Sequence, residues 1–463
     1  FLGLHLMSAF WNPFPLWGVD TLRFLPDGAL AAFFALTAFL LIPRTRLYLV
    51  RLSAKLPVAD GFLERRGSML LLLVVASVAF VGARSATHLL GDGYLLVREL
   101  DTSIHTGSNK PLFLWLIGKL HALSHSLSGS TELTYRACSI FSGIFYVFLS
   151  RLMARKLGRS HTESVVILGF LLTAGFLLLF FGYVETYPIL FPATLLYLLI
   201  GIETLRGKIS LWVPSLLLGL LIPLHLKTIS LSPSLLLLAV FLHLNRSSVR
   251  PARPQGRIDE VPAQTCPVSF PALLKTLATL ATAPAVALIL LLSLGFNPSA
   301  YAATVGGRSF LPLLSAPGFS LPYRLFDPAH MLDVLNQFLL TGSSFLMVLF
   351  LRPGTKLPER PEQTFLLWAG AFPFLLTFLG SPEIGAFRDW DVMAFPSLPL
   401  TLWAALSLTS IHRYGSASMR ARPVPKTGSS RILRSPRSHP AHELLAGKQW
   451  VFTIVIPAGR RSP

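Results

Sequence analysis

Apolar residues follow one another along most of this chain in runs too long and too continuous for one face of a soluble helix or strand. A bilayer core of about 30 Å needs roughly 20 mostly apolar residues per helix, so each run predicts a membrane span. On this measure about eleven spans are expected, near residues 28–43, 68–83, 135–151, 164–181, 188–203, 211–226, 229–244, 272–295, 333–351, 364–380 and 392–411. The pattern therefore predicts an all-α, polytopic integral membrane protein.

The composition agrees with this prediction. Hydrophobic residues make up 52% of the 463 residues and charged residues only 13%, which is outside the range of soluble domains. A net charge of +19 would suit a nucleic-acid partner if the basic residues formed one surface. They are instead spread over separate loops, so no nucleic-acid partner is expected. Cys138 lies in an apolar segment and Cys266 in a basic loop, and this predicts no disulfide framework.

Lys and Arg collect in every second loop between the expected spans. These basic loops lie near residues 44–66, 151–159, 206–208, 246–257 and 352–360, and a basic segment follows residue 412. Short cytoplasmic loops carry such an excess, so the pattern predicts that these loops and the C-terminus face the cytoplasm of a plasma (inner) membrane.

The same pattern predicts the domain organisation. Residues 1–412 form a transmembrane domain, and 413–463 form a Pro, Ser and Arg-rich tail with too little apolar content to fold. The tail is expected to be disordered, cytoplasmic and close to anionic membrane lipids.

Reactive side chains gather in the opposite set of loops. The first of these is residues 84–134, and the others are "GYVETYP" at 182–188, "PLHLKT" at 223–228, residues 296–332 and "SPEIGAFRDWD" at 381–391. Charged groups at the bilayer edge are costly and are typically functional when they face an internal cavity. We therefore expect one extracytoplasmic site, built from Asp92, Lys110, Glu185, His225, Lys227, Arg388, Asp389 and Asp391. Taken singly, each could instead cap a helix, anchor at the headgroups or bond to a neighbouring helix.

Two further features of these loops bear on the chemistry. Asp389 and Asp391 form a D-x-D pair that could hold a divalent cation through hard oxygen ligands. The pair is common by chance, however, and no metal or other cofactor is predicted. The rings of Tyr183 and Tyr187 suit the membrane interface and could also stack against a sugar.

Four pieces of the first third of the chain carry a family resemblance. They are "GDGYLLVREL", "NKPLFLWLIGKLHAL", "SGSTELTYR" and "IFSGIFYVFLSRLMARKLG". In this order and spacing they resemble the first outer loop of the GT-C glycosyltransferases that use polyprenyl-phosphate sugars, in particular the branch of the protein O-mannosyltransferases and the lipid A aminoarabinose transferase. That family often has Glu at the position of Gly93 and a second Pro at the position of Leu112, and its segment between Asp92 and Lys110 is longer. The branch and the acceptor therefore stay open.

The resemblance implies a GT-C-like fold with interfacial helices in the first outer loop, and it implies sugar transfer from a polyprenyl-phosphate donor to a lipid, glycan or protein acceptor. Asp92 matches the family's catalytic acidic position, and Lys110 matches the lysine placed near the carrier phosphate. Phosphate is already a good leaving group, so one carboxylate is enough as the general base of an inverting reaction. Glu185 is the second-choice carboxylate. Fixed cations stabilise the departing phosphate, and Lys227 and Arg388 are candidates beside Lys110.

Two other functions remain open. A secondary transporter also places charges in membrane helices, but it is expected to show internal repeats and charges near the bilayer midplane. No clear repeat is visible here, and the polar residues cluster at the ends of spans. A ligase or polymerase of lipid-linked glycans would also work on the outer face. It is expected to depend on a large late loop, for which loop 296–332, with Arg324 and His330, is the candidate.

Overall fold

The computed structural model describes most of the chain. The described residues are 2–10, 16–24, 27–45, 48, 63–85, 91–102, 108–125, 129–248, 270–305, 310–313, 324–351, 360–382 and 385–420. Two compact units are present, Phe1–Gly415 and Ser416–Pro463. Of the second unit only the end of one helix is described, so nearly all of the tail expected at 413–463 lies outside the described residues.

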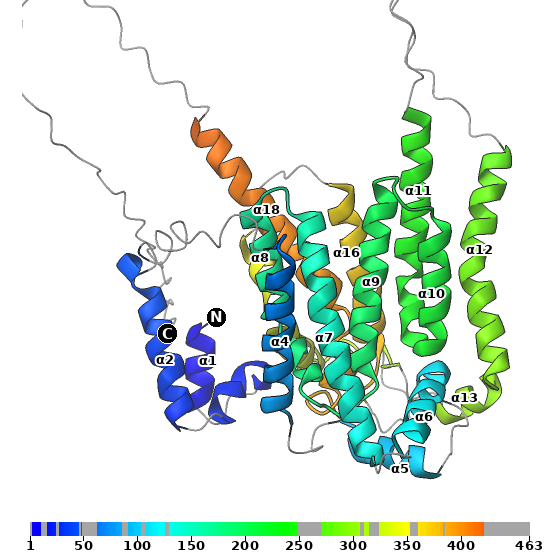
Figure 1. Ribbon diagram of the computed structural model, residues 1–463, viewed down its shortest axis with the longest axis horizontal. Coiled ribbons are helices and arrows are strands. Elements are labelled where there is room, and N and C mark those ends of the chain that lie inside the picture. The colour runs from blue at the N-terminus through cyan, green and yellow to red at the C-terminus, as the bar shows by residue number, and fades with distance from the viewer. Residues whose placement is uncertain are drawn as a thin grey trace, which may run out of the picture. The chain divides into compact units, whose positions relative to one another are not determined.

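The first unit is a bundle of helices (Figure 1). Its elements are α1 (Leu2–Phe10), η1 (Trp17–Phe24), α2 (Asp27–Leu41), α4 (Arg66–Gly82), α5 (Gly93–Thr102), α6 (Pro111–His125), α7 (Thr131–Leu157), α8 (His161–Leu172), η2 (Gly175–Phe180), α9 (Tyr187–Leu205), α10 (Trp212–Leu224), η3 (Leu226–Leu231), α11 (Ser232–Ser248), α12 (Phe270–Ser293), α13 (Pro298–Val305), α14 (Pro328–Thr341), α15 (Ser343–Leu351), α16 (Pro361–Leu379), α17 (Trp390–Ala394) and α18 (Ser397–Arg420). Within the described ranges, pairing of extended backbone is limited to an isolated bridge between Phe310 and Gly380. The predicted all-α fold is confirmed.

The chain is an integral membrane protein by the length and hydropathy of its helices. Six helical stretches of the described chain are long and apolar enough to cross a membrane: Thr131–Leu157, Tyr187–Leu205, Leu226–His243, Phe270–Ser293, Pro361–Leu379 and Trp390–Ser410. A bent pair, α14 with α15, raises the number to seven. The predicted spans 28–43, 68–83, 164–181 and 211–226 coincide with shorter apolar helices. The expected count of about eleven full spans is therefore not confirmed.

Two predicted spans are interrupted where backbones approach closely. The helix expected at 333–351 bends by 108° at Gly342, where the side chain of Thr341 bonds to Ser397 at 2.6 Å. The helix expected at 164–181 ends at Leu172 and resumes as η2. A Cβ on Gly175, the first residue of η2, would lie 1.7 Å from the carbonyl oxygen of Leu340. Both breaks occur at tertiary contacts, and a hydropathy profile contains no information about such contacts.

The centre of the bundle is α7, which packs against α4, α8 and α9. Its start is fixed locally, because the Ser130 side chain accepts the Leu133 N–H at 3.2 Å and caps the first turn. Tyr146 of α7 packs against Phe180 of η2, with ring centroids 5.0 Å apart, and Phe176 of η2 packs against Phe191 of α9, with centroids 4.8 Å apart. This packing holds the loop between η2 and α9 in place, and that loop carries Glu185.

The polar loops are brought together at one end of the bundle. Figure 1 shows α5, α6 and α13 at this end, opposite the free ends of α11 and α12. A hydrogen bond from the Leu226 N–H to the Asn109 carbonyl, at 2.8 Å, joins the turn after α10 to the residue before Lys110. Segments more than a hundred positions apart in the sequence therefore meet here.

Candidate active site

A polar cavity of about 190 Å³ lies where these loops meet. Its lining comes from separate segments, namely Gly91, Asp92, Asn109, Lys110, Glu185, Tyr187, His225, Ser381, Asp389, Asp391 and Val392. Six of the eight side chains expected from sequence to form one site thus share a single cavity, together with Tyr187. Each stands at the end of a helix, where the regular hydrogen bonding of the backbone stops.

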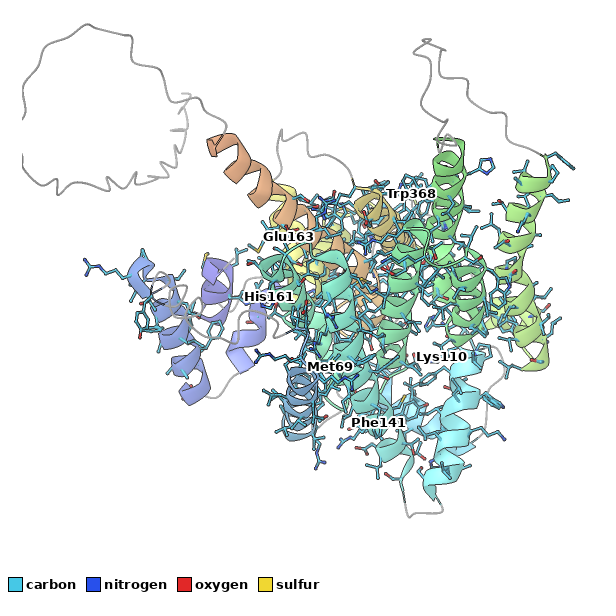
Figure 2. All side chains as sticks on the ribbon, turned by 45° about the horizontal axis from the view of Figure 1, so that its top comes forward. Met69, Lys110, Phe141, His161, Glu163 and Trp368 are labelled. Carbon is cyan, nitrogen blue, oxygen red and sulfur yellow. The ribbon has the colours of Figure 1, made fainter. Side chains whose placement is uncertain are left out.

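Prolines at the starts or ends of helices lie close to three of these side chains. Pro111 begins α6, so Lys110 stands directly before the helix and its carbonyl accepts the first bond, from the Leu114 N–H at 3.0 Å. Figure 2 shows Lys110 at this position. Pro188 lies in the first turn of α9, three residues after Glu185. Pro223 precedes the end of α10, where His225 is the C-cap residue.

Glu185 connects the first loop to α9. Its Oε1 accepts the backbone N–H of Asp92 at 3.0 Å, and its Oε2 accepts the N–H of Thr186 at 2.9 Å. The side chain is 5% exposed, and this burial raises the pKa of the carboxyl above its usual value. Lys110 and the two N–H groups oppose that rise in pKa, while Asp92 adds to it. Glu185 therefore fixes the position of Asp92 at the start of α5.

Gly91 is required by the close packing of this corner. Its φ of +83° is in the left-handed region, which L-residues with a Cβ avoid. A Cβ there would lie 2.5 Å from Tyr183 Oη, 3.3 Å from Glu185 Oε1 and 3.4 Å from Asp391 Oδ2. The backbone just before Asp92 thus leaves no room for a side chain between itself and Tyr183, Glu185 and Asp391.

The change Gly91→Ala is expected to destabilise the protein by about 1–3 kcal/mol, because it adds backbone strain and a clash with Tyr183. The measurement is the midpoint of thermal unfolding in detergent. Gly82→Ala is the matched control, since a Cβ on Gly82 meets nothing within 4 Å. An equal midpoint for both variants would contradict the geometry described for Gly91.

Two lysines lie close to His225. Lys110 lines the polar cavity, and Lys227, which is half-buried, lines the adjoining one and donates its Nζ–H to the carbonyl of Val392. Two positive charges and a ring N–H are therefore available within one small region.

His225 is held as a neutral donor. Its Nδ1 accepts the backbone N–H of Lys227 at 3.2 Å, so the ring proton of the neutral form lies on Nε2. Burial, followed by the charges of Lys110 and Lys227, lowers the pKa of His225 well below its usual value. The ring packs against Tyr187 with centroids 5.1 Å apart. The imidazole therefore stays uncharged at neutral pH and can donate one hydrogen bond.

A second cavity of about 420 Å³ adjoins the polar one. The two share the lining residues Asn109, Tyr187, His225, Ser381, Asp389 and Val392. Beyond the shared region the lining becomes mainly apolar and includes Leu226, Ile229, Phe310, Leu376 and Met393. A ligand with a polar head and a hydrocarbon chain would fit this combination.

The D-x-D pair is buried at the N-terminus of α17. Asp389 is 7% exposed and Asp391 is 1% exposed. Asp391 Oδ1 accepts the N–H of Val392 at 2.8 Å, whereas its Oδ2 is buried without a hydrogen-bond partner in the described structure. Within the described residues, no three His, Cys, Asp or Glu side chains gather in a way that could hold a metal ion. The sequence did not favour a divalent cation at this pair, and that expectation stays a prediction.

Three residues expected near the chemistry lie elsewhere. Arg388 is exposed and lines neither cavity, because the turn at Gly385 accepts the N–H groups of Arg388 and Asp389, at 2.9 Å each, and directs only the aspartate inward. The structure therefore does not bring Arg388 to the site. His330 is buried and its Nε2 pairs with the Phe378 carbonyl at 2.9 Å, and Arg324 is exposed. Neither of these two lines the polar cavity.

Tyr183 lies at the border of the site. It packs against Trp390, with ring centroids 5.7 Å apart, and lines a separate cavity of about 670 Å³. Its burial raises the pKa of the phenol. The tyrosine supports Gly91 and does not line the polar cavity.

Sequence reasoning missed Asn109, Ser381 and Tyr301. Asn109 directly precedes Lys110, and Ser381 begins the loop that ends in the D-x-D pair. Their positions in these polar loops are the sequence signal that could have identified both. Tyr301 belongs to α13 and lines the apolar cavity. Nothing in its local sequence distinguishes it from an interfacial tyrosine.

Comparisons with known proteins give distant likenesses. No family model and no curated protein matches the chain. Among solved structures the chain is similar to ArnT from Cupriavidus metallidurans bound to undecaprenyl phosphate, with 14% identity and a TM-score of 0.45, over 79% of this chain and 66% of that one. It is also similar to the archaeal oligosaccharyltransferase AglB from Archaeoglobus fulgidus, in complex with an inhibitory peptide and a dolichol-phosphate.

For AglB the identity is 13% and the TM-score 0.38, over 78% of this chain and 52% of that one. The chain thus spans just under two thirds of the length of ArnT and about half that of AglB. With TM-scores below 0.5, neither likeness carries a substrate or a mechanism over to this chain. The function has to be inferred from the chain's own residues.

Proposed function

We propose that this protein is a membrane glycosyltransferase that transfers a sugar from a polyprenyl-phosphate donor to an acceptor, with inversion. The observation that carries the proposal is the polar cavity, in which Asp92, Lys110 and neutral His225 share one small space beside an apolar cavity. The resemblance of residues 91–137 to the GT-C first loop supports the same reaction. The sugar and the acceptor, whether lipid, glycan or protein, are left open.

Asp92 acts as the general base. The acceptor hydroxyl gives its proton to the Asp92 carboxylate as its oxygen forms a bond to the anomeric carbon. The bond from that carbon to the phosphate oxygen breaks on the opposite face, and its electron pair leaves with the phosphate, which inverts the configuration. Because phosphate leaves without protonation, one carboxylate is enough. Glu185 is a positioning residue that holds the Asp92 backbone through its Oε1.

Lys110, Lys227 and His225 receive the departing phosphate. Negative charge grows on the phosphate oxygens as the bond breaks, and preorganised cations and N–H donors stabilise it best in a site sheltered from water. The two lysines supply point charges and His225 Nε2 supplies a neutral hydrogen bond. The apolar cavity holds the first isoprene units, and Tyr187, Asp389 and Asp391 line the space left for the sugar.

The distribution of Lys and Arg supports an extracytoplasmic site. Arg206 and Lys208 follow α9 at the end where the chain passes to α10, whereas Glu185 precedes α9 at the other end. Short loops rich in Lys and Arg stay in the cytoplasm. The polar cavity then faces away from the cytoplasm, whereas the C-terminus lies in the cytoplasm.

The transfer rate is expected to rise with pH through the raised pKa of Glu185, because the ionised carboxylate is the stronger acceptor for both N–H groups. The charged and titratable groups that share its surroundings are Lys110, Asp92, Asp389, Asp391, Tyr183, Tyr187 and His225. In Glu185→Gln the acidic limb of the rate profile should move to lower pH. The maximal rate should fall roughly tenfold to a hundredfold, as expected for the loss of one hydrogen bond to a charged group.

The measurement for this prediction is the rate of transfer against pH in proteoliposomes. Glu132→Gln is the control, since Glu132 pairs with Arg136 at 2.6 Å on α7 and does not line the cavity. An acidic limb at the same pH in wild type and Glu185→Gln would refute the role given to Glu185.

The function is tested with the purified full chain in proteoliposomes supplied with a panel of labelled polyprenyl-phosphate sugars and a membrane extract as acceptor. The expected result is protein-dependent release of polyprenyl phosphate and a labelled product of inverted configuration. Labelled solute uptake that collapses with the ion gradient, without donor consumption, would contradict the proposal and favour a transporter. The clustering of polar side chains at one end of the bundle already speaks against that alternative.

A further inference from the structure

A large basic cavity lies at the opposite end of the bundle from the polar site. It has a volume of about 830 Å³ and is formed by the turn between α9 and α10, the end of α11 and the start of α12. Figure 1 shows the free ends of α11 and α12 on this side, away from α5 and α6. This cavity has no part in the reaction proposed above.

The lining is positively charged. Arg206, Lys208 and Lys275 all contribute to it, and among the described residues no carboxylate does. Lys275 is exposed and has no ion-pair partner in the part of the chain that the structure describes. The cavity therefore presents cationic groups that its own lining leaves uncompensated.

The nearest carboxylates are shared among several cations. Glu203 forms ion pairs with Lys156 at 3.3 Å, Arg206 at 3.3 Å and Lys208 at 3.4 Å. Glu362 forms an ion pair with Arg206 at 3.1 Å. These two carboxylates pair with three cations, and Lys275 is a fourth. An excess of positive charge therefore remains. The ion pairs also hold Arg206 and Lys208 at the rim of the cavity, which reduces the entropy lost when an anion binds.

The helix α12, which contributes Lys275 to the cavity, has an exposed apolar surface suited to acyl chains. In the apolar 18-residue stretch of α12, only 11% is buried inside the protein. Leu274 is 56% and Leu277 53% exposed beside Lys275. Trp212, at the start of α10, is 51% exposed at the same end, as expected for an aromatic residue at the membrane interface. Cationic groups near the start of α12 and exposed leucines on the same helix match a phospholipid in one leaflet.

We propose that this cavity binds the phosphate headgroup of an anionic phospholipid, with its acyl chains along α12. Basic pockets between membrane helices take such headgroups. Arg206, Lys208 and Lys275 contact the phosphate and the anionic headgroup, and Leu274 and Leu277 contact the chains. The bound lipid fills the space between α12 and the turn before α10.

The test compares lipid retention by the purified full chain in detergent. The protein is incubated with phosphatidylglycerol or phosphatidylcholine of equal chain length, and bound lipid is measured by native mass spectrometry. Wild type should retain phosphatidylglycerol preferentially. The double change Lys208→Gln with Lys275→Gln should lower that preference roughly 25-fold, about fivefold for each lysine near the lipid surface. The change Lys275→Arg should keep it.

The control is Lys119→Gln, since Lys119 is an exposed lysine of α6 at the other end of the bundle. Equal retention of both lipids by wild type would overturn the proposal, as would an equal loss in the control. Displacement of phosphatidylglycerol by millimolar inorganic phosphate would assign the cavity to a soluble anion and would also overturn it. No sugar donor is present, so the result does not depend on the proposed transfer reaction. A thermal unfolding midpoint within the wild-type range shows that the double variant is folded, and a folded variant with unchanged lipid preference contradicts the proposal.

Discussion

Replacement of Asp92 by asparagine is expected to lower the rate of sugar transfer by roughly 10²–10⁴-fold, because the amide cannot take the proton of the acceptor. The change keeps the shape of the side chain. It also keeps the contact that places the residue, since the backbone N–H of Asp92, and not its side chain, bonds to Glu185. The binding of the donor should therefore change much less than the rate.

The rate is measured with a labelled donor in proteoliposomes, and folding is checked by thermal unfolding. Asp27→Asn is the matched control, because Asp27 is an exposed aspartate in the first turn of α2 and is absent from the lining of the polar cavity. A folded Asp92→Asn variant that transfers sugar at the wild-type rate would remove the proposed base.

The change Lys110→Met is expected to lower the rate by roughly 10²–10³-fold, since a fixed cation that stabilises charge developing in the transition state has an effect of this size. Lys110 lines the polar cavity beside Asp92 and His225, so it can reach the departing phosphate. The affinity for free polyprenyl phosphate should fall as well, because that product carries the same charge.

The control for this variant lies on the same helix. Lys119 of α6 is exposed and its Nζ stands 6.0 Å from the centroid of the Trp115 ring. Lys119→Gln should therefore transfer sugar at the wild-type rate. Equal losses in Lys110→Met and Lys119→Gln would indicate a general effect of charge on α6 and would contradict the phosphate role of Lys110.

The membrane helices could be predicted from sequence because each needs only a continuous apolar run. What hydropathy cannot register is a break caused by a distant segment. One helical run ends at Leu172, just before Gly175 approaches the Leu340 backbone, and another ends at Gly342 near Ser397. Both contacts join parts of the chain that are far apart in sequence, so a reading of local pattern makes each helix too long.

The candidate site was predictable for a related reason. Asp92, Lys110, Glu185 and His225 each stand next to the end of an apolar segment, and alternation of the spans places those ends on one side. The direction of a single side chain within a turn is not decided by that alternation. Gly385, with a φ of +94°, opens a turn that buries Asp389 and exposes Arg388. For this reason one of the two neighbouring charges reaches the cavity and the other does not.

The most direct test of the central claim is an experimental structure of the protein with a polyprenyl phosphate. We expect density for the phosphate between Lys110, His225 and Lys227, with the isoprenoid chain running along Ile229 and Met393 of the apolar cavity. Phosphate density at another place in the molecule, with this polar cavity filled only by water, would contradict the account.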